Sequence, residues 1–304
     1  MGENVTVFAL GIDLGGTKIR AGLMRQDGTL ERVLECQTLA HRGPDAVIAD
    51  MAALMQDVIR DVARDQIRGI GIGSPGPLDV TTGIVESPHN LPGFAHVPLA
   101  NRIESMMQIP TVLDNDANVA ALAEYRYGDG QGIQNMVYVT ISTGIGGGII
   151  ENGQVVRGRR GMAGEFGHIS IDALHGNPCI CGNRGCLEAI ASGPAIAKTA
   201  SDRLARDVTT KEVGELAQQG DPVALAVLHE AFDALGAGIV NLLHIFDPER
   251  VILGGGVTQM GPGLLDHVRN YVTAHVMPPY RDVTVNYAKL KQDVGVIGAA
   301  CLIL

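Results

Sequence analysis

Four residues near the middle of the chain have the types and spacing of a metal site. Cys179, Cys181 and Cys186 fall within eight residues, and His168 precedes them. Three thiolates and one imidazole form the tetrahedral Cys₃His set that binds zinc, and a site closed by four protein ligands is structural rather than catalytic. Unrelated free thiols are the alternative. Because five cysteines, an odd number, do not suggest a disulfide framework in a chain this long, zinc is the favoured interpretation.

A second group of polar residues precedes a predicted helix. Asp114, Asn115, Asp116 and Asn118 stand before the strong helix former at residues 119–124. Asn115 or Asp116 should therefore lie at or next to the helix N-cap, and simple capping is the alternative to a chemical role. Four polar residues are more than one cap requires, and the helix dipole keeps a carboxylate at this end ionised. Such a carboxylate can orient a hydroxyl and accept its proton late in phosphoryl transfer.

A glycine-rich turn near the N-terminus could hold phosphate groups. The segment Asp13-Leu14-Gly15-Gly16-Thr17-Lys18 lies between two predicted strands. The Walker loop and the dinucleotide fingerprint both need a helix after the glycines, so this context excludes them. A glycine hairpin can still point backbone N–H groups at a phosphate, with a hydroxyl from Thr17 and with Asp13 facing a metal ion. A plain hairpin is the alternative.

Two further glycine turns follow predicted strands. Residues 142–148 again place a hydroxyl residue, Thr143, beside glycines, and Gly254-Gly255-Gly256 follows a buried strand. Two hairpins in corresponding places are better evidence than one, because a polyphosphate needs to be held from both sides. The third turn would let backbone approach adenine or ribose, or it could simply connect a strand to a helix.

These residues are positioned by an order of elements that occurs twice. Strands are predicted at residues 5–12 and 18–25, with a glycine turn between them and a hairpin at Asp27-Gly28. The same order returns with strands at 136–141 and 149–150 and a hairpin at Asn152-Gly153. A duplicated architecture with a ligand between its halves is the interpretation we favour.

The remaining elements are one more strand in each half and three helices. Apolar periodicity predicts helices at 45–63, 222–246 and 294–304, and short apolar runs predict strands at 67–72 and 251–253. No low-complexity linker divides the chain, so closely apposed domains are expected.

Composition excludes several classes of function. The 304 residues are 46% hydrophobic and 18% charged, which is typical of a globular protein, and the net charge of −10 argues against nucleic-acid or anionic-membrane partners. No stretch approaches the roughly 20 apolar residues of a membrane span, and no secretion signal is seen. Residues 2–6 fit the loose myristoylation pattern, which we disfavour because a strand is expected from Val5. A cytoplasmic location is expected.

With these residues assembled, the sequence resembles the ROK family (repressors, open reading frames and kinases). Three motifs occur in the family's order: Asn115-Asp116-Ala117-Asn118, Glu165-x-Gly-His168, and Cys179-x-Cys-Gly-x-x-Gly-Cys186-x-Glu188. The resemblance implies an α/β fold with two RNase-H-like domains of the actin-like ATPase superfamily around a central cleft. The N-terminal domain would comprise residues 1–115 and a C-terminal helix at about 293–304; the C-terminal domain, residues 116–292, would carry the zinc-binding loop.

The resemblance also implies the roles of individual residues. Asp116 would be the general base for the 6-hydroxyl of a sugar, and His168 would both bind the zinc and contact the sugar. The implied sugar contacts are Gly76, Asn90, Asn115, Asp116, Glu165, His168 and Glu188. The implied ATP and Mg²⁺ contacts are Asp13, Gly15, Gly16, Thr17, Lys18, Thr143, Gly144, Gly254, Gly255 and Gly256. A structural Zn²⁺ would be bound by His168, Cys179, Cys181 and Cys186, and family members are commonly homodimers.

ATP-dependent phosphorylation of the 6-hydroxyl of a hexose, with glucose favoured, is the function that the resemblance implies. N-acetylmannosamine or N-acetylglucosamine kinases are close alternatives, and fructokinases and allose kinases remain open. A sugar-responsive transcriptional repressor is disfavoured, because it needs a basic DNA-binding head and this chain is acidic.

Overall fold

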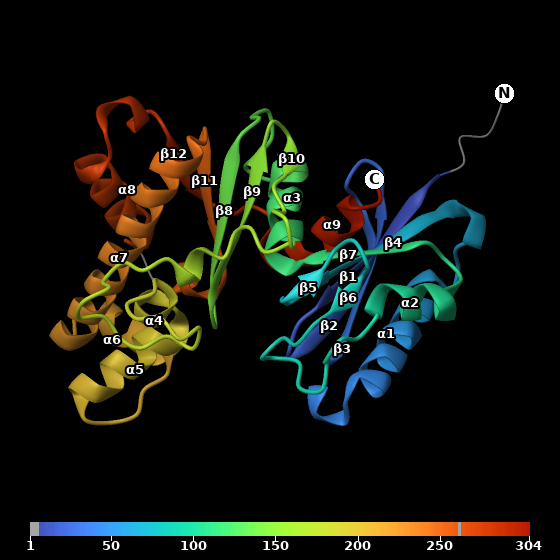
Figure 1. The fold of residues 1–304 in the computed structure, drawn as a ribbon, viewed down its shortest axis with the longest axis horizontal. Coiled ribbons are helices and arrows are strands. Elements are labelled where there is room, and N and C mark those ends of the chain that lie inside the picture. The colour runs from blue at the N-terminus through green and yellow to red at the C-terminus, as the bar shows by residue number, and fades with distance from the viewer. Residues whose placement is uncertain (1–5, 261–262) are drawn as a thin grey trace. The chain divides into compact units, whose positions relative to one another are not determined.

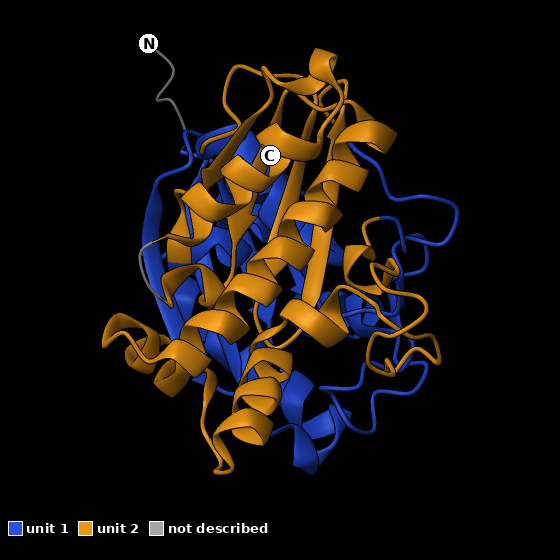
Figure 2. Cartoon of the chain, turned by 90° about the vertical axis from the view of Figure 1, so that its left-hand side faces the viewer, with its two compact units in different colours: residues 1–128, 155–163, 292–304 blue, residues 129–154, 164–291 orange. Residues whose placement is uncertain are grey.

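The computed structural model describes residues 6–260 and 263–304, and the chain divides into two compact units. Unit 1 consists of Met1–Gly128, Val155–Ala163 and Gln292–Leu304, and unit 2 of Asp129–Gln154 and Gly164–Lys291 (Figure 2). The expected strand start at Val5 and most of the myristoylation pattern at 2–6 lie outside the described residues.

Unit 1 is built on a five-stranded sheet in the order β3-β2-β1-β4-β7 (Figure 1). β2 pairs antiparallel with both β1 and β3, while β4 runs parallel to both β1 and β7. The strands are β1 (Phe8–Leu14), β2 (Lys18–Arg25), β3 (Leu30–Gln37), β4 (Ile67–Ser74) and β7 (Thr111–Asn115), with the small hairpin β5 (Leu78–Asp79) and β6 (Ile84–Val85). The predicted strand at 18–25 is confirmed, and the first strand begins and ends later than predicted.

The helices of unit 1 are α1 (Pro44–Ile59), α2 (Leu99–Met107), α3 (Asp116–Tyr127) and α9 (Val294–Cys301), with the short 3₁₀ helices η1 (Ala40–Arg42) and η2 (Arg64–Gln66) and, at the boundary with unit 2, η6 (Lys291–Asp293). One core of buried Leu, Ile, Val and Met side chains from β1, β4, α1 and α2 supports the sheet. The predicted helix at 45–63 is confirmed but ends earlier, at Ile59.

Unit 2 repeats the sheet of unit 1. Its strand order is β10-β9-β8-β11-β12, with β8 and β9 antiparallel and β11 parallel to both β8 and β12. The strands are β8 (Met136–Ile141), β9 (Ile145–Glu151), β10 (Gln154–Val155), β11 (Arg250–Gly254) and β12 (Thr284–Tyr287). The duplicated architecture predicted from the sequence is therefore confirmed in strand order and in the directions of β8, β9, β11 and β12.

The helices of unit 2 include one that is long and apolar. They are α4 (Glu188–Ala191), α5 (Gly193–Leu204), α6 (Thr210–Gln218), α7 (Pro222–Phe246) and α8 (Leu264–His275), with the 3₁₀ helices η3 (Phe166–His168), η4 (Gly256–Gln259) and η5 (Pro278–Tyr280). By length and composition α7 could cross a membrane, contrary to the sequence expectation, but 61% of its most apolar window is buried inside the structure. It packs against α4, α5, α6 and α8, so it is a core helix of unit 2.

The structure also differs from the sequence predictions at the domain boundary and in one glycine-rich segment. Residues 116–128 and 155–163 group with unit 1, although the predicted boundary assigned them to the C-terminal domain. The reason for the first is that α3 packs on α9, where Gly298 lies directly against the Val119 backbone. Residues 145–148 of the predicted turn at 142–148 belong to β9, because the bare backbone of Gly147 lets the Phe166 ring pack on the strand.

Close packing of α9 on the sheet generates a test of the fold. A Cβ at Gly71 of β4 would overlap the backbone carbonyl of Ala299, which cannot move without moving α9. Gly71→Ala should therefore lower the free energy of unfolding by about 3 kcal/mol, at the upper end of the usual cost of overpacking. Urea denaturation measures this change. Gly69→Ala on the same strand first meets the Ile303 side chain, which can rotate, and should cost about 1 kcal/mol or less. Equal losses in the two variants would contradict the described packing.

Candidate active site

The polar segment 114–118 forms the turn from β7 into α3. Asn115 is the N-cap of α3: its backbone is extended, and its side-chain oxygen accepts hydrogen bonds from the backbone N–H groups of Ala117 (2.9 Å) and Asn118 (3.4 Å). Asp116 is the first residue of the helix. The predicted cap is confirmed at Asn115, which leaves the Asp116 carboxylate at the positive end of the helix dipole.

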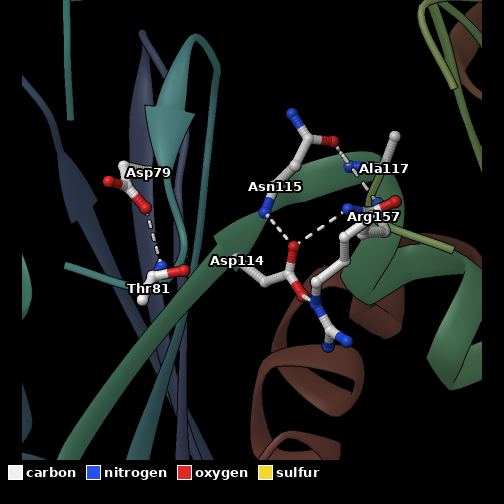
Figure 3. A network of polar contacts seen from close by, with 7 residues as sticks. Asp79, Thr81, Asp114, Asn115, Ala117 and Arg157 are labelled. Atoms are coloured by element: carbon white, nitrogen blue, oxygen red, sulfur yellow. Dashed lines mark hydrogen bonds and ion pairs between the residues drawn. The ribbon is translucent and has the colours of Figure 1, made fainter. Parts of the chain in front are cut away.

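The buried carboxylate of Asp114 fixes this turn through its hydrogen bonds (Figure 3). Asp114 is 1% exposed, and its Oδ1 accepts the backbone N–H of Asn115 (2.7 Å) and the side-chain amide of Asn118 (2.9 Å). Its Oδ2 accepts the Nε–H of Arg157 at 2.7 Å. Arg157 was not among the predicted residues, because no motif surrounds it. The only signal was a cluster of three arginines, 157, 159 and 160, in an acidic chain.

The first predicted glycine turn lies between β1 and β2 and contacts Asn90, a predicted sugar contact. Gly16 lies against Asn90, since a Cβ at position 16 would be 2.8 Å from the Asn90 carbonyl oxygen. The hydroxyl of Thr38 holds the turn by donating to the Gly15 carbonyl at 2.6 Å. Lys18, a predicted phosphate contact, pairs its ammonium with the Glu35 carboxylate on β3 at 2.7 Å.

Two more predicted residues of unit 1 meet near α3. A Cβ at Gly76 would be 3.3 Å from the side-chain nitrogen of Asn115, so Gly76 backbone lies against the cap. Asp13, near the end of β1, is half-buried, and burial raises the pKa of its carboxyl while the charge of Arg20 lowers it by less. Folding therefore works against the ionised form of Asp13.

In unit 2 the four predicted metal ligands come together. The ligand atoms of His168, Cys179, Cys181 and Cys186 all lie within 4.8 Å of one another. Nδ1 of His168 is 3.6 Å from the Cys179 sulfur, and the Cys181 and Cys186 sulfurs are 3.6 Å apart. Zinc bond lengths of about 2.3 Å to sulfur and about 2.0 Å to nitrogen require tetrahedral edges of about 3.5–3.8 Å. The Nδ1–sulfur and sulfur–sulfur separations of 3.6 Å are therefore those expected around a tetrahedral zinc ion. Gly182 and Gly185, with φ of +88° and +66°, allow the short loop to turn around it.

The remaining predicted sugar contacts of unit 2 lie beside this cluster. His168 ends the 3₁₀ helix η3 and donates its backbone N–H to the carbonyl of Glu165 at 3.1 Å. Glu188, the first residue of α4, accepts the backbone N–H of Ile145 through Oε2 at 2.8 Å. The four predicted metal ligands thus adjoin both predicted carboxylates.

Two predicted glycine turns of unit 2 line one cavity of about 640 Å³. Thr143 contributes from the turn between β8 and β9, and Gly256 from the turn after β11. Gly255 has φ of +88° and packs against the Ile141 backbone, which brings the two turns together. The volume suits a small organic ligand. The cavity is also lined by Thr210, Gln218 and Gln259, which sequence reasoning missed because they lie in no glycine motif.

The predicted site residues are divided between the units. Unit 1 carries Asp13, Gly15, Gly16, Thr17, Lys18, Gly76, Asn90, Asn115 and Asp116. Unit 2 carries Thr143, Gly144, Glu165, His168, Cys179, Cys181, Cys186, Glu188, Gly254, Gly255 and Gly256. Each unit therefore combines one predicted phosphate-binding turn with predicted sugar contacts.

Comparison with known proteins gives matches over nearly the whole chain. The family model described as the ROK family matches residues 9–304. A glucokinase of Halalkalibacterium halodurans is 34% identical over 97% of this chain and 94% of its own length. An N-acetylmannosamine kinase of Escherichia coli is 37% identical over 96% of this chain and 97% of its own.

Solved structures give the same result. A ROK hexokinase from Thermus thermophilus superposes with a TM-score of 0.88 at 36% identity, covering 98% of both chains. A ROK glucokinase from Streptomyces griseus, solved with glucose and AMPPNP, has a TM-score of 0.82 at 33% identity, covering 97% of this chain and 99% of its own. The α/β fold with mixed sheets is therefore shared with ROK sugar kinases.

The burial of Asp13 predicts a gain in stability when its charge is removed. Its folded pKa lies above the ordinary 3.8, so near pH 7 the ionised carboxylate destabilises the fold, and this penalty disappears as pH falls through the folded pKa. Asp13→Asn should therefore raise the melting temperature at pH 7, and the gain should vanish near pH 3.

Asp79→Asn is a control in which the opposite change in melting temperature is expected. Hydrogen bonds from the backbone N–H groups of Thr81 and Thr82 lower the pKa of Asp79, so its charge stabilises the fold above pH 3.8. This variant should melt lower than wild type at pH 7 and equal to it in acid. Equal melting temperatures of Asp13→Asn and wild type at pH 7 would contradict the assigned burial.

Proposed function

The chain belongs to the ROK family, and from this membership we propose that it is a kinase that transfers the γ-phosphoryl group of ATP to the 6-hydroxyl of a hexose. The observation that carries the proposal is the Asp116 carboxylate at the head of α3. Full-length similarity to proteins named glucokinase and hexokinase supports it. We propose glucose as the acceptor.

We propose that Asp116 acts as the general base. The 6-oxygen forms a bond to the γ-phosphorus as the bond from that phosphorus to the bridging oxygen of ADP breaks, and the hydroxyl proton passes to Asp116. The Asn115 cap and the Asp114 hydrogen bonds hold the first turn of α3 in place. A base held in this way needs no reorganisation as the proton is transferred.

We propose that the predicted sugar contacts bind the acceptor sugar. Gly76, Asn90 and Asn115 would contact it from unit 1, and Glu165, His168 and Glu188 from unit 2. Nδ1 of His168 faces the metal ligands, so its Nε2 would be the nitrogen that contacts the sugar. Water excluded from such a site could not compete with the sugar as phosphoryl acceptor.

ATP would bind in the cavity lined by Thr143 and Gly256, with its base and ribose near the turn at Gly256 and its phosphates at the turn that carries Thr143. Gly144, Gly254 and Gly255 would contribute backbone on that side, and the turn formed by Gly15, Gly16 and Thr17 would contact the phosphates from unit 1. Asp13 would hold a Mg²⁺ ion, which neutralises phosphate charge when bound. Lys18 would reach a phosphate only by releasing Glu35.

We propose that His168, Cys179, Cys181 and Cys186 bind a structural Zn²⁺, supported by the clustering of their ligand atoms within 4.8 Å of one another. We further propose that each unit is an RNase-H-like domain of the actin-like ATPase superfamily, supported by the repeated strand order. The homodimer and the cytoplasmic location stay predictions.

N-acetylmannosamine is the second candidate acceptor, favoured by the 37% identity to an N-acetylmannosamine kinase. The two sugars differ at C2, and discrimination at one substituent depends on hydrogen-bond geometry around it. An ADP-release assay over glucose, mannose, fructose, allose and the two N-acetylhexosamines tests the proposal. The highest kcat/KM is expected with glucose, and no turnover with any of the six would contradict the kinase function.

Removing the charge of Asp116 should stop the reaction without preventing binding. General-base catalysis contributes about 10²–10⁴-fold, so Asp116→Asn should lower kcat at least about 100-fold, while calorimetry should find sugar affinity within about threefold of wild type. Asp65→Asn, an exposed carboxylate of unit 1, is the matched control and should keep full activity. A rate above a few per cent of wild type in Asp116→Asn would show that another group takes the proton.

Loss of a metal ligand should weaken sugar binding. Purified protein should hold one zinc ion per chain by atomic absorption, and Cys181→Ser should lose most of it. Because His168 would lose its orientation, sugar affinity should fall about tenfold. Cys36→Ser, outside the cluster, should keep both the metal and the affinity. Wild-type protein without zinc, or a Cys181→Ser variant that binds sugar normally, would count against this role.

A further inference from the structure

Glu188 contacts the nucleotide side of unit 2 as well as the proposed sugar side. Its Oε2 accepts the backbone N–H of Ile145 at 2.8 Å, across 43 residues of sequence. A Cβ at Gly144 would lie 2.6 Å from the same oxygen, so the carboxylate lies directly beneath the turn. Ile145 is the first residue of β9 and follows the turn that carries Thr143.

Among the described residues, three hydrogen bonds hold this turn, residues 142–144. Ser142 donates its backbone N–H to the Gly144 carbonyl, and Gly193 donates to the Ser142 carbonyl, each at 2.8 Å. The third bond joins the Ile145 N–H to the Glu188 carboxylate. Only this third bond has a charged partner, and a hydrogen bond to a charged acceptor is roughly twice as strong as one between neutral groups.

Glu188 is in turn held by the metal loop, the segment 168–186 that carries the four predicted metal ligands. It begins α4 two residues after the metal ligand Cys186, and the Ala189 N–H donates to the Cys186 carbonyl at 3.0 Å. On the other side Gly167, next to the ligand His168, packs so closely that a Cβ there would be 3.2 Å from the Glu188 Cβ and would overlap the Ile145 carbonyl. The position of Glu188 relative to both ligands is therefore fixed by backbone contacts.

A single carboxylate can serve both neighbours. Its two oxygens offer about four acceptor positions, so Oε2 can hold the Ile145 N–H while Oε1 accepts a sugar hydroxyl. Within the part of the chain that the structure describes, Oε1 has no hydrogen-bond partner. A sugar contact alone would leave the bond to Ile145 unexplained.

We propose that Glu188 is a positioning residue for the phosphate-binding turn 142–144. Through it, the metal loop orders the nucleotide site in addition to the sugar site. The inference rests on the proposed function, because it takes the turn beside Thr143 to contact ATP. Without the carboxylate the Ile145 N–H loses its acceptor, and binding nucleotide must then also order the turn.

The test measures affinity for MgAMPPNP in the absence of sugar, by calorimetry on the metal-loaded protein. Glu188→Ala should bind about tenfold more weakly than wild type, the effect expected from losing one hydrogen bond to a charged group. Glu188→Gln should stay within about threefold, because its amide oxygen can still accept the Ile145 N–H. Glu165→Ala, which removes a proposed sugar contact but does not touch the turn, should bind MgAMPPNP as wild type does.

The outcomes separate this inference from the proposed function. If wild-type protein does not bind MgAMPPNP, the kinase proposal itself fails. If wild type binds and Glu188→Ala binds equally well, Glu188 acts on the sugar alone and the inference is overturned. An equal loss of MgAMPPNP affinity in Glu188→Ala and Glu165→Ala would also overturn it. The loss would then come from removing any proposed sugar contact of unit 2 and not from the bond to Ile145.

A second measurement covers the case in which Glu188→Ala does not fold. In the amide NMR spectrum, the Ile145 N–H should move upfield in Glu188→Gln, because a neutral acceptor makes a weaker bond than a carboxylate. The Ser142 N–H, whose acceptor is a backbone carbonyl, should not move and is the internal control. An unchanged Ile145 signal would overturn the proposal.

Discussion

The arrangement around α3 depends on one buried carboxylate that must have its hydrogen bonds satisfied. Asp114 is 1% exposed, and a buried charge without partners would cost several kcal/mol. Its three partners come from the next residue, from the first turn of α3 and from the segment 155–163. Satisfying them fixes where β7 ends and where α3 begins. Asp116 is at the helix head as a consequence.

Local chemistry made much of this predictable from the sequence. The N-cap at Asn115 follows from side-chain capping, and the Cys₃His cluster from ligand types and spacing, both of which act over a few residues. Arg157 was missed because its partner Asp114 is 43 residues away in the sequence. The glycines 146–148 were assigned to a turn because only the packing of Phe166 on Gly147 shows why a strand needs them. The domain boundary was misplaced because it depends on α9 packing against α3.

The two units use one sheet plan for different tasks. In each, the hairpin between the first two strands carries a glycine turn, at Gly15–Gly16 in unit 1 and at Gly144 in unit 2. Unit 1 adds a carboxylate at a helix N-terminus, where a proton can be taken up. Unit 2 adds the Cys₃His cluster and the cavity lined by Thr143 and Gly256, where ligands can be oriented. The duplicated fold thus supplies similar turns, and the segments inserted around them supply the chemistry.

The proposed reaction requires Asp116 to take the proton of the sugar hydroxyl that attacks ATP. A crystal structure of the protein with glucose and MgAMPPNP tests it most directly. If Asp116 is the base, the glucose O6 should lie within about 2.6–3.2 Å of an Asp116 carboxylate oxygen, with Glu165, His168 and Glu188 on the other hydroxyls. Glucose bound with O6 out of hydrogen-bond reach of Asp116 and beside another base would contradict it.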